Sequence, residues 1–405
     1  MRILILGPWA IARPRHGGQI RAANIVQAYS SEGHEVKFVG VYDPGNVPLS
    51  DTTRDDVPID HAVMHYIHHS GLPWEISLWR AFVDVKPLYE RFVAVVRDFR
   101  PDIVQFEEPY LWPLVRALRG AGELGRARVI HSSYNFETQY RRELGRIAGH
   151  LDEAVLGDVA LQERQIAREC DMVITVSDDD ADSFKKLGAP RVIVARNGSS
   201  AISPSPAAVR AVDGYTGGAP FALFVSSAHP PNAEGLLHFV DGIEETLPGK
   251  LFVCGAVYRL LAERRKKHRL LRDADMWGMV EPQVLEALLS RASVVLLPKT
   301  SGGGSNLKTS EALLARRPVV ATRLAFTGFE DWQDLSGVEI EDDPMQFWQR
   351  VAHRLESTEP AWNGQADARR NELLWEACLA PMLNEVTRQS AGSAEITHDP
   401  SLIGA

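Results

Sequence analysis

Cysteine, clustered positive charge and long apolar runs are all scarce in this sequence of 405 residues. The three cysteines, Cys170, Cys254 and Cys378, are far apart, so they have neither the spacing of zinc ligands nor that of a disulfide framework. The formal net charge of −9 argues against nucleic acid as a partner, because neutralising phosphates needs clustered lysine and arginine. No apolar stretch approaches the roughly 20 residues of a membrane-spanning helix.

Two features bear on location. The apolar run at residues 2–6 is too short for the core of a signal peptide, and no small-residue cleavage site follows it. We therefore expect a cytoplasmic protein. The basic run Arg264, Arg265, Lys266 and Lys267 predicts an exposed helix face; the alternative is peripheral contact with an anionic membrane at its inner face, or with a phosphorylated acceptor.

Short runs rich in Val, Ile and Leu alternate with longer helical patterns along most of the chain. Continuous apolar runs are typical of strands buried on both faces, as in parallel sheets covered by helices. These runs lie at residues 2–7, 34–42, 102–106, 128–133, 171–177 and 191–197, and then at 221–227, 250–255, 292–298 and 318–322. Two such series predict an α/β fold with two doubly wound, Rossmann-like domains.

The expected domain boundaries follow from composition. Residues 201–219 are rich in Ser, Pro, Gly and Ala, which predicts a linker between an N-terminal domain (1–200) and a C-terminal domain (220–360). A C-terminal helix that crosses back to the N-terminal domain is expected over 361–390, and a disordered tail over 391–405. Ligands of parallel sheets bind beyond the carboxyl ends of the strands, so the residues just after each strand are the candidates for chemistry.

The segment 301–322 carries the most specific pattern in the chain. A glycine-rich turn follows a strand, and a helix is predicted to begin at Ser305 or Asn306. Glycines allow close approach of backbone N–H groups, and a helix N-terminus adds partial positive charge, which together suit a diphosphate. Lys308 adds a full charge, and the Glu311 carboxylate can accept two hydrogen bonds from a ribose. The alternative is an ordinary capped helix with a solvated glutamate.

This segment resembles the donor-site signature of the large family of retaining GT-B glycosyltransferases, the bacterial group 1 or family 4 type. The resemblance rests on Pro298, the glycine turn, Glu311-Ala312 and the run 318–322. It implies two Rossmann-like domains facing a central cleft and a ribose-binding role for Glu311. The family's earlier glutamate, which reaches the donor hexose, is replaced by Gly303, which puts contact with the sugar ring in doubt.

Two further segments resemble the family's donor domain. VSSAHPPNAEG (225–235) is similar to its first phosphate-facing loop, and WGMVEP (277–282) to its nucleobase loop, with Glu281 expected to cap the next helix. The resemblance thus predicts a donor site formed by Ser226, Ser227, Asn232, Gly278, Met279, Val280, Gly303, Gly304, Ser305, Asn306, Leu307, Lys308 and Glu311.

In the N-terminal half, RPRHGGQIRAANIV resembles the family's first glycine loop, and SSYNFETQY resembles its Asp-x-His-Asn-Val-Glu stretch. Tyr134 stands where the family has histidine, so it is no near-neutral proton shuttle, although its hydroxyl can bond a sugar. His131 is a candidate substitute; the alternative is a structural histidine at a strand end. The catalytic candidates are Gly17, Gly18, Tyr134, Asn135, Glu137 and Lys308.

No metal or cofactor is expected. Asp178, Asp179 and Asp180 lie at a predicted helix start, where carboxylates complement the helix dipole, which favours capping over metal binding. The histidines His65, His68 and His69 are expected in a solvated loop rather than in a metal site.

The resemblance implies a glycosyltransferase that moves a sugar from a nucleoside-diphosphate sugar to an acceptor hydroxyl with retention. The expected context is surface polysaccharide, glycolipid or other glycoconjugate synthesis. A catalytically silent nucleotide-sugar-binding protein is one alternative, raised by Gly303 and Tyr134. A nucleotide-sugar epimerase or a phosphorylase of the same architecture is the other.

Overall fold

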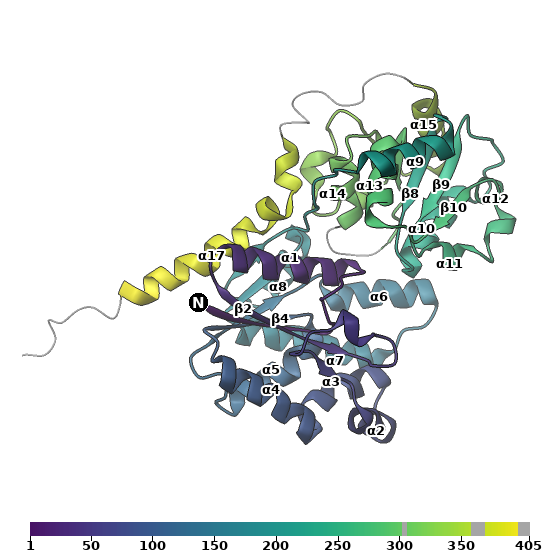
Figure 1. Ribbon diagram of the computed structural model, residues 1–405. Helices are drawn as coiled ribbons and strands as arrows, with labels where there is room; N and C mark the ends of the chain where they lie inside the picture. Colours follow the sequence, from purple (N-terminus) through teal and green to yellow (C-terminus); the bar gives the residue numbers. More distant parts are fainter. Residues whose placement is uncertain (302–305, 358–368, 396–405) are drawn as a thin grey trace, which may run out of the picture. The chain divides into compact units, whose positions relative to one another are not determined.

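The computed structural model describes residues 1–301, 306–357 and 369–395, and the chain forms two compact units (Figure 1). Unit 1 comprises Met1–Thr138, Asp152–Arg196 and the chain from Glu376 onward, and unit 2 comprises Gln139–Leu151 and Asn197–Trp375. The chain therefore returns to unit 1 after completing unit 2. In the described part of the chain, no helix has both the length and the apolarity needed to cross a membrane.

Unit 1 is built on a seven-stranded parallel sheet with the order β3-β2-β1-β4-β5-β6-β7. Its strands are β1 (Arg2–Gly7), β2 (Glu35–Tyr42), β3 (Val57–Pro58), β4 (Ile103–Glu107), β5 (Arg128–Ser132), β6 (Met172–Thr175) and β7 (Val192–Val194). The chain runs outward from β1 to β3 and then returns to pair β4 with the other side of β1. This reversal between β1 and β4 is a topological switch point.

The helices of unit 1 are α1 (Gly17–Ser31), α2 (His61–His69), α3 (Trp74–Asp84), α4 (Lys86–Phe99), α5 (Trp112–Gly120), α7 (Glu153–Glu169), α8 (Asp178–Lys186) and α17 (Trp375–Glu395), while α6 (Glu137–Ala148) begins in unit 1 and continues in unit 2. The unit boundaries pass through the first turn of α6 and the first residue of α17. Within unit 1, α17 is fastened by an ion pair between Arg191 and Glu385, with an N–O separation of 2.5 Å.

Unit 2 has a six-stranded parallel sheet with the order β10-β9-β8-β11-β12-β13. Its strands are β8 (Phe221–Val225), β9 (Lys250–Cys254), β10 (Asp275–Gly278), β11 (Val294–Leu297), β12 (Val319–Ala321) and β13 (Val338–Ile340). The helices are α9 (Pro206–Thr216), α10 (Pro230–Val240), α11 (Tyr258–Leu261), α12 (Arg269–Arg272), α13 (Pro282–Arg291), α14 (Leu307–Leu314) and α15 (Pro344–Glu356). Its switch point lies between β8 and β11.

The sheet of unit 2 is buried on both faces, which explains the continuous apolar runs. Along β8, Phe221 and Leu223 belong to one core cluster while Ala222 and Phe224 belong to another on the opposite face. Successive side chains of a strand point to opposite faces, so a strand covered on both sides has no polar position. Each of the ten predicted apolar runs contains a strand, and the prediction of two doubly wound domains is confirmed.

Several local predictions were wrong. The segment 201–219 is not an irregular linker, because α9 occupies Pro206–Thr216: Ser205 caps its first turn and Val212 is buried. The three histidines of 65–69 lie in α2 rather than in a loop, because Asp60 caps that helix and its Val63–Ile67 face is buried. In both segments a capping side chain and a few buried apolar residues stabilise a helix, although the neighbouring residues are polar or small.

The chain ends and the basic run also differ from expectation. Residues 264–267 do not form one face of a regular helix, because the chain there makes a 3-10 turn at Arg265–Lys267 followed by the short α12. Helix α17 continues to Glu395, so residues 391–395 are helical rather than a disordered tail. The predictions for 361–368 and 396–405 lie outside the described residues.

Candidate functional site

The switch point of unit 2 brings the main predicted donor segments to one edge of the sheet. Strands β8 and β11 are parallel neighbours, and the connections that follow them leave toward opposite sides. Ser226 and Ser227 follow β8 and lead into α10, while the chain from Pro298 follows β11 and leads into α14. Carboxyl ends of neighbouring parallel strands meet at the same edge, so these two connections flank a single crevice.

Helix α14 begins as predicted, with Asn306 as its cap. The Asn306 side-chain oxygen accepts a hydrogen bond from the Lys308 backbone N–H at 3.2 Å. The first turn carries no acidic residue, so the partial positive charge at this helix start is not offset by its own side chains. The Ser301 hydroxyl, just before the glycine turn, is buried and has no hydrogen-bond partner among the described residues. Gly303, Gly304 and Ser305 lie outside the described residues.

The two charged residues predicted to bind the nucleotide contact each other. Lys308 Nζ lies 2.8 Å from Glu311 Oε2, one turn apart on the part-exposed face of α14. The opposite face is fixed in the core: Thr309 and Ser310 are fully buried, and the Ser310 hydroxyl donates to the Gly198 carbonyl. The helix therefore holds Lys308 and Glu311 as an adjacent cation and anion.

The loop after β8 is shaped by backbone contacts. Ser226 is buried, and its N–H donates to the Cys254 carbonyl at 2.9 Å. Ser227 is exposed, and Asn232 Nδ2 donates to its hydroxyl at 3.2 Å. The structure thus brings Ser227 and Asn232 together at the start of α10, as the predicted phosphate-facing loop requires.

The predicted nucleobase loop lies at the end of β10, two strands from β8. The Gly255 N–H donates to the Gly278 carbonyl at 2.6 Å, and both glycines have positive φ, of 97° and 63° respectively. Next to this hydrogen bond, Met279 is exposed and Val280 is half-buried.

Glu281 occupies the N-cap position of α13, as predicted. Its side chain makes no capping hydrogen bond, so the predicted capping interaction is not present.

Gly235 allows α10 to pack directly on the end of β11. A Cβ atom at this position would lie 2.2 Å from the Pro298 carbonyl oxygen, which is a backbone atom. Replacing Gly235 by alanine is therefore expected to lower the free energy of unfolding by about 1–3 kcal/mol, the range for overpacked cores. Denaturant titration measures the effect. The matched control is Gly214→Ala in α9, where nothing lies within 4 Å and alanine should be neutral or stabilising by up to about 1 kcal/mol. Equal denaturation midpoints for the two variants would contradict the packing argument.

In unit 1, the predicted glycine loop also lies beside a switch point. Helix α1 begins at Gly17, after the connection from β1. A Cβ atom at Gly18 would lie 2.7 Å from Trp9 Cη2 and 3.0 Å from Tyr134 Cε2. A larger residue at this position would therefore have to displace the Trp9 and Tyr134 rings, whether or not a ligand approaches the helix start.

Tyr134 is mostly buried and is held by the same elements. Its hydroxyl donates to the Gly18 carbonyl at 3.3 Å, and its ring stacks on Trp9 with centroids 5.8 Å apart. Burial raises the pKa of the Tyr134 hydroxyl well above its usual range, which agrees with the prediction that it does not shuttle protons. Asn135, the next residue, is half-buried, and its carbonyl accepts a hydrogen bond from the Ser133 hydroxyl.

His131 is not a substitute for the missing family histidine. It is fully buried between the rings of Phe106 and Phe184, with centroids 4.7 and 5.8 Å away. Burial lowers the pKa of His131 to about 3, and a contact with the Phe106 backbone opposes this shift only in part. The imidazole is therefore neutral and inaccessible, and the alternative of a structural histidine is correct.

Glu137 is the first residue of α6, and its backbone N–H is bound by the carboxylate of Glu163, a residue that the sequence analysis did not identify. The Glu137 side chain accepts a hydrogen bond from the Tyr110 hydroxyl, and its N–H donates to Glu163 at 2.6 Å. Glu163 also accepts the Thr138 N–H at 3.2 Å, so it caps α6 from the middle of α7. Burial raises the pKa of Glu163 to about 7. Nothing in the local sequence pattern marks a glutamate 26 positions away as a cap.

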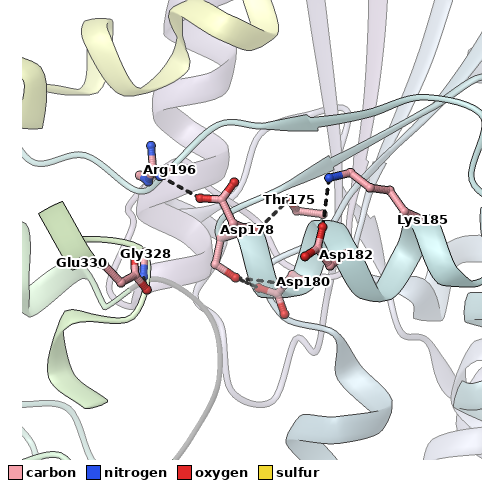
Figure 2. Close-up of polar contacts among 9 residues, drawn as sticks. Thr175, Asp178, Asp180, Asp182, Lys185, Arg196, Gly328 and Glu330 are labelled. Carbon is pink, nitrogen blue, oxygen red and sulfur yellow. Dashed lines mark hydrogen bonds and ion pairs between the residues drawn. The ribbon is translucent and has the colours of Figure 1, made fainter. Parts of the chain in front are cut away.

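The acidic run lies in the first turn of α8, as predicted (Figure 2). Asp178 forms an ion pair with Arg196 at 2.9 Å. Asp180 is buried and accepts from the Phe136 N–H at 2.8 Å and from the Ser177 hydroxyl at 2.6 Å. These carboxylates thus engage separate partners, and over the described ranges no three His, Cys, Asp or Glu side chains are grouped to hold a metal ion.

Three charged residues beside the switch point of unit 1 were missed. Arg21 on α1 and Glu107 at the end of β4 are buried, and so is Glu108, whose φ of 67° and ψ of 147° are unusual for a residue other than glycine. A buried charged side chain at a switch point is the physical signal that identifies residues of this kind. The local sequence could not reveal it, because it does not show which charged side chains are buried.

Known proteins resemble the chain over most of its length. A "Glycosyl transferase 4-like domain" model matches residues 16–198, and a "Glycosyl transferases group 1" model matches residues 219–357. Glycogen synthase from Mycobacterium tuberculosis is 24% identical over 343 residues, covering 81% of this chain and 79% of the relative.

Solved structures share the fold at low sequence identity. Sucrose-phosphate synthase from Thermosynechococcus elongatus has a TM-score of 0.72 at 17% identity and covers 97% of this chain and all of its own. Anabaena Alr3699/HepE in complex with UDP has a TM-score of 0.67 at 13% identity, over 96% of this chain and all of its own. With two family models spanning most of the sequence, the protein belongs to the group 1 glycosyltransferases of GT-B fold.

Proposed function

We propose that the protein transfers a sugar from a nucleoside-diphosphate sugar to an acceptor hydroxyl with retention of configuration, in the synthesis of a polysaccharide, glycolipid or other glycoconjugate. The observation that carries the proposal is the Lys308–Glu311 pair on the first turns of α14, at the switch point of unit 2. A nucleoside diphosphate carries a diol next to a diphosphate, and this pair offers a carboxylate next to an ammonium.

Each part of the site has a distinct task. The start of α14 and Lys308 hold the diphosphate and stabilise the negative charge that grows on it as the glycosidic bond breaks. Glu311 accepts hydrogen bonds from the ribose hydroxyls. Ser227 and Asn232, joined at the start of α10, contact the phosphates from the β8 side, and the backbone of Met279 and Val280 binds the nucleobase. The departing phosphate assists attack on the same face, so no protein nucleophile is needed.

The acceptor is assigned to the carboxyl edge of the unit 1 sheet. There Gly17 and Gly18 begin α1, and Asn135 and Glu137 precede and begin α6. The relatives support the donor class: one is named a glycogen synthase, and another was solved with UDP. A catalytically silent nucleotide-sugar-binding protein is the second candidate, because the Tyr134 hydroxyl donates to the Gly18 carbonyl. An epimerase of the same fold remains the other rival.

Nucleotide release separates these functions. Wild-type protein is incubated with a panel of nucleoside-diphosphate sugars and mixed acceptor sugars, and free nucleoside diphosphate and glycoside products are measured. Transfer gives equimolar nucleotide and glycoside. Binding without release would identify the silent protein, and an isomerised nucleotide sugar would identify the epimerase.

Donor binding is expected to need no divalent metal. Asp178 and Asp180 engage Arg196, Phe136 and Ser177, which leaves no converging carboxylates at this helix start. Nucleotide affinity measured by calorimetry should be the same with excess EDTA and with manganese. A loss of binding in EDTA that manganese restores would contradict this prediction.

Contact with an anionic membrane is proposed for the basic run of unit 2. Lys266 and Lys267 are exposed on a 3-10 turn, whereas Arg264 pairs with Glu234 at 2.5 Å. The two lysines should each contribute about 1 kcal/mol near an anionic surface. Sedimentation with phosphatidylserine vesicles at low salt is expected to be stronger for wild type than for Lys266→Ala/Lys267→Ala. Equal sedimentation of the two proteins would rule out this surface.

A further inference from the structure

A buried pair of opposite charges lies beneath the start of α1 in unit 1. Arg21 is 1% exposed and Glu107 is fully buried, and their charges attract each other. Taking two ions out of water costs several kcal/mol each, so a buried pair is seldom retained for stability alone. This Arg21–Glu107 charge pair therefore calls for another explanation.

The charge pair is the inner end of an ordered polar network. Gln105 Nε2 donates to Glu107 Oε1 at 2.6 Å, and the Tyr29 hydroxyl donates to Gln105 Oε1 at 2.8 Å. Tyr29 lies two turns after Arg21 on the same buried face of α1. The network thus joins two points of α1 to the end of β4, the strand at the switch point.

The outer end of the network contacts residues assigned to the acceptor edge. The Arg21 guanidinium carbon lies 5.8 Å from the centre of the Tyr134 ring. Tyr134 in turn donates to the Gly18 carbonyl and stacks on Trp9. Because Gly18 has no side chain, these two rings pack directly on the first turn of α1, which is also held by a hydrogen bond from Gln19 Nε2 to the Ala10 carbonyl at 2.9 Å.

We infer that Arg21 and Glu107 are positioning residues for the transfer reaction, which hold Tyr134 and through it the Gly17–Gly18 turn of α1 in the geometry that receives the acceptor. This inference rests on the proposed transferase function. Neither side chain touches substrate: Arg21 and Glu107 are closed off from solvent and act through the ring above them. Burial lowers the pKa of Arg21 and raises that of Glu107, and their mutual charge opposes both shifts.

The test removes both charges together, so that no buried ion is left without its partner. Arg21→Met replaces the guanidinium with an unbranched apolar side chain, and Glu107→Gln keeps the length of the side chain and can still accept from Gln105. We expect kcat to fall at least 10-fold, while the affinity for nucleoside diphosphate, which unit 2 binds, changes less than 2-fold. Arg21→Lys, which retains the positive charge, should keep more activity than Arg21→Met. The matched control is Arg97→Met/Glu123→Gln, which removes an ion pair between α4 and the segment after α5 in unit 1 and should leave kcat unchanged.

A second readout makes the inference independent of turnover. Amide hydrogen exchange over residues 9–22 should be faster in the Arg21→Met/Glu107→Gln variant, with the denaturation midpoint close to that of wild type. Unchanged kcat with unchanged exchange would overturn the inference, as would loss of activity that follows global unfolding. If the wild-type protein transfers no sugar from any donor, the proposed function fails, and the exchange comparison alone then decides whether the charge pair positions this turn.

Discussion

Replacing Lys308 by alanine is expected to lower the rate of sugar transfer by about 100- to 1,000-fold, the usual cost of removing one preorganised donor from a site where charge develops. The negative charge on the leaving diphosphate is greatest in the transition state, so kcat should fall more than donor affinity does. Nucleoside diphosphate release under saturating donor measures the first quantity, and calorimetric titration with the nucleotide measures the second.

The control for this variant is Lys250, which lies in unit 2 at the amino-terminal edge of the sheet, opposite the carboxyl-terminal edge where α14 begins. Lys250 is the first residue of β9 and forms an ion pair with Asp275 at 3.1 Å, so Lys250→Ala removes a comparable charge away from the carboxyl ends. Its turnover should match wild type. Equal rates for Lys308→Ala and Lys250→Ala would show that Lys308 does not contact the leaving group.

Replacing Glu311 by alanine is expected to weaken nucleotide binding about 10- to 150-fold, which corresponds to about 1.5–3 kcal/mol for hydrogen bonds to a charged group. The 2.8 Å contact with Lys308 adds a second consequence. Without Glu311 the Lys308 ammonium loses its neighbour and can shift toward the phosphates, so the loss of affinity should be larger for a nucleoside diphosphate than for pyrophosphate.

Titrations of Glu311→Ala with a nucleoside diphosphate and with pyrophosphate separate the two effects. Asp275→Ala serves as the control, because it removes a paired carboxylate from the start of β10. Wild-type affinity of Glu311→Ala for the nucleoside diphosphate would refute the ribose assignment. An equal loss for both ligands would assign Glu311 to the orientation of Lys308 alone.

Much of the fold was predictable because parallel strands buried on both faces leave a local signal. The apolar residues 221–225 show no polar alternation, and they form the strand β8, which contributes to two core clusters. The strands β3, β10 and β13 were missed because β3 spans two residues and because β10 (DMWG) and β13 (VEI) are half-buried and contain a charged residue, so neither forms a continuous apolar run. The helix α9 was missed because the segment 201–219 was judged by its Ser, Pro, Gly and Ala composition, although serine is favoured as a helix cap and proline in the first turn of a helix.

The site was predictable where one local segment supplies it. Lys308 and Glu311 are three positions apart, so the spacing of a single helix places them on one side, and Asn306 is the cap of the same helix. The capping of α6 by Glu163 and the burial of Arg21 and Glu107 depend on residues brought together from distant segments. No local pattern encodes such contacts, and charged residues are expected at the surface by default.

The central claim is that the β8–β11 edge of unit 2 binds a nucleoside-diphosphate sugar through Lys308 and Glu311 for transfer. The most direct measurement is release of free nucleotide from a panel of UDP, GDP, ADP and dTDP sugars by wild type, Lys308→Ala and Glu311→Ala, each with mixed acceptor sugars. The account predicts release for at least one nucleotide, coupled to glycoside formation and reduced at least 100-fold in Lys308→Ala. Release that is equal in all three proteins, or no binding of any nucleotide by wild type, would contradict it.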